Sequence, residues 1–164
     1  MKRIITLFAI IGLVAFSGCT NEDNVDSDTI AEVIEINGVN FNSSNGFRIR
    51  YDLKPEIYPQ DMVLVYRLVA VENGVKVWGT LPETAFDNNG AYDFSYNFEF
   101  SKYDVDIFIQ GFDLGSIISN LRLNQTFRIV IVPGYFSKTL DTNNYISVMK
   151  ALNLKENQVQ QIRL

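Results

Sequence analysis

Alternation of apolar and polar residues predicts strands in two parts of the chain. Residues 47–53 alternate without a break, and residues 92–100 carry an aromatic side chain at every second position. A period of two is typical of a strand with one buried face and one solvated face. We expect the rings to form the core face of a strand, because an exposed stripe would be an aggregation hazard. A glycan-stacking platform is the alternative. The rings are Tyr92, Phe94, Tyr96, Phe98 and Phe100.

Longer apolar runs predict strands that are covered on both faces. Residues 62–71 form such a run, and Asn73-Gly74 then favours a type I′ hairpin turn with residues 75–78 as the return strand. Asn37-Gly38 offers a second turn, at the end of an early strand. Further strands are predicted over residues 31–36, 105–110 and 127–132.

Only the end of the chain changes to a helical period. Tyr145, Val148, Met149 and Leu152 are spaced as on one helix face, residues 141–144 offer several N-cap side chains, and Asn153 can end the helix. A last short segment, helical or extended, is expected to pack back on the domain.

These elements predict an all-β fold, an immunoglobulin-like β-sandwich of about seven strands with a short C-terminal helix. The label describes architecture alone, because a chain whose only cysteine is Cys19 cannot form the immunoglobulin disulfide. A small β-barrel is the alternative. The sandwich domain is expected to cover residues 30–164, a length that can bury a core without disulfides.

The charge balance excludes one class of partner. The chain has 14 Lys and Arg against 19 Asp and Glu, a formal net charge of −5. Nucleic-acid binding depends on basic residues that neutralise phosphate, so no nucleic-acid partner is expected. Docking on anionic lipid through a basic patch is disfavoured for the same reason.

The N-terminus has the parts of a secretory signal. Lys2 and Arg3 precede an apolar run over residues 4–16, which is shorter than the about 20 residues a membrane-spanning helix needs. Small residues and Cys19 follow. The stretch Phe16-Ser17-Gly18-Cys19 resembles the lipobox of bacterial lipoproteins, although Phe16 replaces the usual aliphatic residue. The resemblance implies cleavage after residue 18, lipidation of Cys19 and anchoring in the outer membrane.

Residues 19–29 are acidic and nearly free of apolar side chains, so we expect a flexible tether. Glu22 and Asp23 lie where Bacteroidetes lipoproteins carry acidic residues, a pattern similar to a surface-export signal. That resemblance implies exposure at the cell surface, and the periplasmic face of the outer membrane is the alternative.

Candidate chemistry is scarce. The absence of histidine removes Ser-His-Asp and Cys-His catalysis and His-ligated zinc, and no nucleotide-binding fingerprint occurs. We therefore expect no enzyme, no cofactor and no metal. The acids that would serve a carboxylate-based hydrolase are interpreted as solvated surface: Glu83, Asp87, Asp93, Asp104 and Asp106. The loop at residues 87–93 is rich in oxygen ligands, but its glycine is misplaced for a calcium loop and a turn is favoured.

Trp78 is the one indole in the chain and the candidate ligand contact. An amphipathic ring at a rim can anchor a sugar or a protein partner, whereas packing in or over the core is the commoner role.

The segments MVLVYRL, FRIVIVPG and YISVMKALNL, with the hairpin that ends at Trp78, resemble a domain of uncharacterised Bacteroidetes lipoproteins. Some of these relatives carry collagen-like repeats, which are missing here. The resemblance implies a location and a fold but no functional residues. Three hypotheses remain: a non-catalytic interaction or envelope-structural module with an unknown protein partner, a glycan-binding module, and a hydrolase.

Overall fold

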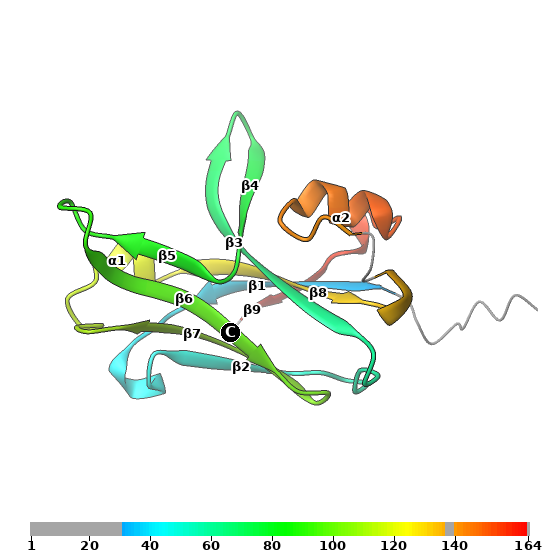
Figure 1. Ribbon diagram of the computed structural model, residues 1–164, viewed down its shortest axis with the longest axis horizontal. Coiled ribbons are helices and arrows are strands. Elements are labelled where there is room, and N and C mark those ends of the chain that lie inside the picture. Colours follow the sequence, from blue (N-terminus) through cyan, green and yellow to red (C-terminus); the bar gives the residue numbers. More distant parts are fainter. Residues whose placement is uncertain (1–30, 137–139, 164) are drawn as a thin grey trace, which may run out of the picture.

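The computed structural model describes residues 31–136 and 140–163, which form two packed sheets and two short α-helices (Figure 1). The strands of sheet A, in spatial order, are β4 (Val75–Thr80), β3 (Met62–Glu72), β8 (Gln125–Val132), β1 (Glu32–Val39) and β9 (Gln160–Arg163). The strands of sheet B are β2 (Arg48–Asp52), β7 (Asp104–Gly111), β6 (Tyr92–Phe100) and β5 (Glu83–Phe86). The helices are α1 (Ser119–Arg122) and α2 (Tyr145–Ala151), with 3₁₀ turns at Ser43–Asn45, Gly134–Phe136 and Glu156–Gln158.

The main core lies between the two sheets. Alternate residues of β8 and β1 meet the inward residues of β6 and β7, and most are at most 4 % exposed. The central members are Ile34, Ile36, Phe94, Tyr96, Ile107, Ile109, Phe127 and Ile129. The prediction of a β-sandwich is therefore confirmed at the level of two packed β-sheets.

A second, smaller core lies on the other face of sheet A. Figure 1 shows α2 packed over this face, on the side away from sheet B. Val148 and Met149 of α2 pack there against Val130 and Leu64 of the sheet. Sheet A is thus covered on both faces, which explains why β3 and β8 are apolar runs without alternation.

The aromatic stripe of β6 is confirmed as core in its central part. Phe94 and Tyr96 are each 1 % exposed, and Phe98 is half-buried. The outer rings, Tyr92 and Phe100, extend past the edge of the core and are exposed. A platform of five exposed rings is not present.

Two turn signals have different outcomes. Asn73 and Gly74 have φ values of 50° and 81°, so the type I′ hairpin between β3 and β4 is confirmed. The prediction that Asn37-Gly38 turns the first strand is wrong. There β1 gains one extra residue against β8 between Ile36 and Val39, and Gly38, with φ 75°, forms a bulge within the strand.

The described residues form nine strands, two more than the about seven that the sequence indicates. The additional strands, β5 and β9, are four residues each, and both lie at sheet edges where a mostly polar sequence is tolerated. Over the described residues, both sheets keep open edges, so the β-barrel alternative is wrong.

The C-terminal helix is confirmed. Asn144 caps it by accepting a hydrogen bond from the backbone N–H of Ser147, and Asn153 follows it with a φ of 53°. Tyr145, Val148 and Met149 are its buried face. The last segment of the chain adds β9 parallel to β1.

Candidate functional site

Trp78, the candidate ligand contact, lies in β4 beneath the start of α2. Its half-buried ring packs against the second core, and its centroid is 5.5 Å from that of Tyr145. The guanidinium carbon of Arg128 lies 4.2 Å from the centre of the indole. The indole of Trp78 therefore packs over a buried cation, so its main role is structural.

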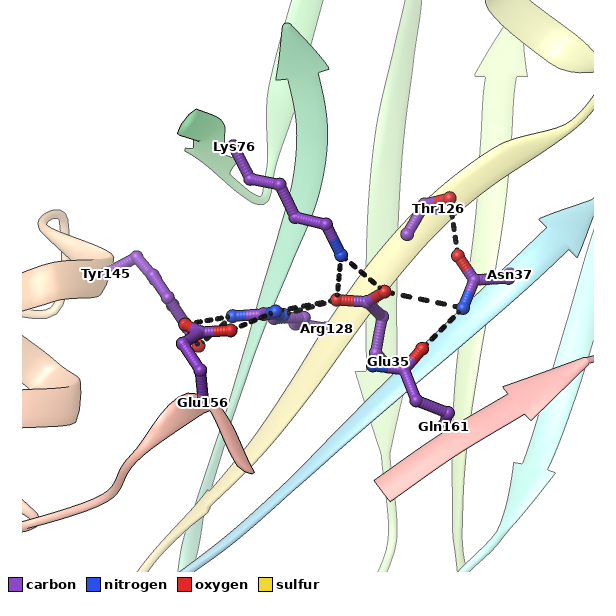
Figure 2. A network of polar contacts seen from close by, with 8 residues as sticks. All are labelled: Glu35, Asn37, Lys76, Thr126, Arg128, Tyr145, Glu156 and Gln161. Carbon is purple, nitrogen blue, oxygen red and sulfur yellow. Dashed lines mark hydrogen bonds and ion pairs between the residues drawn. The ribbon is translucent and has the colours of Figure 1, made fainter. Parts of the chain in front are cut away.

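Around Arg128, four charged side chains form a closed ionic network, drawn in Figure 2. Arg128 Nε donates to Glu35 Oε2 at 2.7 Å, and its two terminal nitrogens donate to the two carboxylate oxygens of Glu156 at 2.8 and 2.7 Å. Lys76 Nζ donates to both oxygens of Glu35, at 2.7 and 2.8 Å. Two cations thus face two carboxylates, and the network is neutral.

The centre of this network is deeply buried. The side chains of Arg128 and Glu35 are 1 % and 2 % exposed, and the two residues are direct cross-strand partners in β8 and β1. They point to the face of sheet A that α2 covers, whereas their neighbours in sequence point into the main core. A buried ion pair costs little only when both charges are fully hydrogen-bonded, as they are here.

Polar side chains extend the network on both sides. Arg128 also donates to the hydroxyl of Tyr145, which in turn donates to Glu156 Oε1 at 3.4 Å. On the other side, Asn37 Nδ2 donates to Gln161 Oε1 at 2.9 Å and Thr126 donates to Asn37 Oδ1 at 3.0 Å. Figure 2 shows that these contacts join β1, β4, β8, β9 and the segment that carries α2.

The ionisation of the network follows from its contacts. Burial alone would raise the pKa of Glu35, but hydrogen bonds from Lys76 and Arg128 outweigh it and the pKa is lowered. Burial raises the pKa of the Tyr145 hydroxyl to about 12, so this group stays protonated at neutral pH. The lowered pKa values of Glu35 and Glu156 keep both carboxylates charged at neutral pH, beside a neutral phenol.

A groove of about 290 Å³ opens beside Trp78. One wall is β4, and the other is the start of α2 with the two residues before it. Four consecutive β4 residues line it, so the groove follows the edge of the strand. The lining residues are Val75, Lys76, Val77, Trp78, Asn143, Asn144, Tyr145 and Ile146.

A second cavity, of about 220 Å³, lies between the sheets near the start of β1. Glu32, Tyr51 and Asp61 contribute polar atoms to it. Asp61 Oδ2 accepts a hydrogen bond from the Tyr58 N–H at 3.0 Å, and Oδ1 is buried with no partner among the described residues.

Most of the acids considered above as candidate hydrolase residues form ion pairs with arginines. Asp106 accepts two hydrogen bonds from Arg50 and one from Arg48, each at 2.7 Å, on the outer face of sheet B. Arg50 and then Arg48 keep the pKa of Asp106 low despite its burial. Glu83 binds Arg67 in the same manner.

The loop after β5 is a turn, as the sequence favours. Asp87 Oδ1 accepts the backbone N–H groups of Asn89 and Ala91, both at 2.8 Å, and Gly90 supplies a φ of 79°. The hydrogen bond from Ala91 is the main cause of the lowered pKa of Asp87. Among the described residues, no three His, Cys, Asp or Glu side chains are grouped as a metal site would require.

The remaining candidate residues, Cys19, Glu22 and Asp23, lie outside the described residues. Within residues 31–136 and 140–163, no helix has the length and apolar character to cross a membrane. Comparison of the chain with protein families, with characterised proteins and with solved structures gives no match.

Proposed function

We propose that this protein is a lipid-anchored surface protein whose β-sandwich acts as a non-catalytic interaction or envelope-structural module. The neutral network around Arg128 carries the proposal. Its two carboxylates, the buried Glu35 and the exposed Glu156, are bound by cations, and the Tyr145 hydroxyl stays protonated, so the site is built to hold elements together. Nothing in it resembles a carboxylate pair that shares a proton or activates water.

The anchoring part of the proposal rests on the sequence. The lipobox resemblance at Cys19 supports attachment to the outer membrane, with surface exposure favoured by Glu22 and Asp23. A stable anchor needs two or more acyl chains, which lipoprotein processing would supply. The tether would then hold the sandwich clear of the bilayer.

We also infer an immunoglobulin-like architecture, in which two sheets present loops at both ends for partner contact. The spatial strand order differs from the ABED and CFG sheets of immunoglobulin domains, so the likeness concerns architecture alone. The glycan-binding alternative has less support, because Phe94 and Tyr96 are buried and the indole of Trp78 lies over Arg128.

Protease treatment of intact cells tests the proposal. The wild-type protein should be degraded while a periplasmic marker survives, and Cys19→Ala should be lost from the membrane fraction. Glu22→Ala/Asp23→Ala should remain in the membrane but become protected. A wild-type protein that resists protease on intact cells and is cut only in broken cells would refute surface display.

A further inference from the structure

An exposed aromatic cluster lies at one end of sheet B. Phe86, Tyr92 and Phe112 are 63 %, 40 % and 92 % exposed. Exposed rings that gather in one place mark interaction sites more often than single exposed apolar residues do. We call these three residues the aromatic tip.

The strand pairing assembles the tip from three separate segments. A register shift between β5 and β6 leaves Asp93 as the extra residue of a bulge and sets Phe86 directly opposite Tyr92. The Tyr92 hydroxyl donates to the backbone carbonyl of Gln110 at 2.8 Å, which holds its ring against the end of β7. Phe112, just after β7, meets that ring edge-on with the centroids 6.0 Å apart.

An acidic residue directly follows each ring of the tip. The three steps are Phe86-Asp87, Tyr92-Asp93 and Phe112-Asp113. None of the three carboxylates forms an ion pair within the part of the chain that the structure describes. Since consecutive Cα atoms are about 3.8 Å apart, each carboxylate is carried by the residue next to a ring, and we call these three acids the rim.

The surroundings of the tip supply no free cation. Residues 83–101 and 103–121 contain no lysine or arginine. Farther along sheet B, Arg48 lies opposite Phe108 and is bound by Asp106 and Glu99. Arg122, in the helix that follows, donates to the carbonyl of Ile117. The tip is thus an apolar aromatic surface with a net negative rim.

The geometry points to a basic segment of a partner protein as the ligand of the aromatic tip. An arginine or lysine can lie over a ring face while its charge meets a neighbouring carboxylate, so rings and rim act on the same group. A neutral sugar would use the rings and could donate hydrogen bonds to the carboxylates, but it carries no positive charge to pair with theirs. A nucleic acid or an acidic peptide would be repelled by the rim.

The position of the tip suits contact away from a membrane. Figure 1 shows the ends of β5 and β7 at the left of the molecule, whereas the chain enters the sandwich at the start of β1, on the right. This part rests on the proposed function: a chain anchored at Cys19 would present the tip on the far side of the sandwich.

The test is fluorescence anisotropy with the full chain, purified in non-ionic detergent. The probes are a labelled ten-residue peptide of alternating Arg and Gly, the same peptide with Glu for Arg, and a neutral hexasaccharide as competitor. We expect binding of the Arg peptide alone, with affinity that falls as salt rises. Phe86→Ala/Phe112→Ala should weaken it about tenfold.

Two further variants separate the contributions. Asp93→Asn/Asp113→Asn should remove most of the salt dependence and leave both rings in place. Tyr103→Ala removes an exposed aromatic ring, 57 % exposed, elsewhere in the molecule and should bind like the wild type. No binding of the Arg peptide, equal binding by the ring variant, or displacement by the hexasaccharide would overturn the assignment. Because the assay uses purified protein, its result is independent of surface display on cells.

Discussion

The guanidinium carbon of Arg128 lies 4.2 Å from the centre of the Trp78 ring and packs over the indole. The same guanidinium binds Glu35 and Glu156, so the aromatic ring, both acids and Lys76 form one unit. Through Glu156, this unit joins the 3₁₀ turn that precedes β9 to the centre of sheet A. Trp78 is therefore first a structural residue, and it also lines the groove between β4 and α2.

Arg128→Met should destabilise the fold by about 3–5 kcal/mol, because it leaves the buried Glu35 with one cation, Lys76, in place of two. Urea unfolding, followed by circular dichroism, measures the change. The double variant Glu35→Leu/Arg128→Met replaces both ions with apolar side chains and should lose much less. A double variant that is less stable than Arg128→Met would contradict the structural role of the pair.

Stability should fall on acidification. The pKa values of Glu35, Glu156 and Asp106 are lowered in the folded protein, so the unfolded chain binds protons more readily. The stabilisation is therefore complete above the ordinary glutamate pKa of 4.5 and is lost as pH falls through the lower folded values. Thermal unfolding between about pH 6 and pH 3 measures this. Glu156→Gln should show a shallower loss, and a Tm independent of pH in the wild type would refute the assignment.

The fluorescence emission of Trp78, the single tryptophan, reports on the ionic network around Arg128. Arg128→Met removes the cation from the indole face and should shift the emission of Trp78, whereas a neutral hexasaccharide should leave it unchanged. A saturable change with the sugar would favour the glycan-binding alternative. Lys155→Met, at an exposed position after α2, serves as the control for substitutions of a cation.

Gly74→Ala should cost about 1 kcal/mol, because the hairpin turn requires a φ of 81° at this position. Gly115→Ala is the matched control, since its backbone does not adopt positive φ and the added methyl meets only ordinary contacts. The control should be neutral or slightly stabilising. Equal losses at both positions would show that the turn conformation is not the cause.

The spacing of apolar residues and the residue types in the turns make most of the fold predictable. The hairpin at Asn73-Gly74, the buried centre of β6 and the capped helix at Asn144 all follow from local sequence and are confirmed. The strand β5 is not predictable in this way, and the sequence indicates a last packed segment at β9 without deciding between helix and strand, because four-residue edge strands depend on a neighbour for their hydrogen bonds. The turn predicted at Asn37-Gly38 is wrong because the same dipeptide can form either a turn or a bulge within a strand.

The ionic network is only partly visible in the sequence. Glu35 and Arg128 are charged residues within apolar strands, a pattern that indicates a buried pair. Their partnership depends on the register between β1 and β8, which lie far apart in the chain. Glu156 and Lys76 cannot be assigned at all without the tertiary structure, because they reach the pair from a turn and an edge strand.

The most direct test of lipid anchoring is mass spectrometry of the N-terminal peptide from the membrane-bound protein. The mature chain should begin at Cys19, and this peptide should carry the mass of attached acyl chains. A mature chain that starts elsewhere, or an unmodified Cys19, would contradict it.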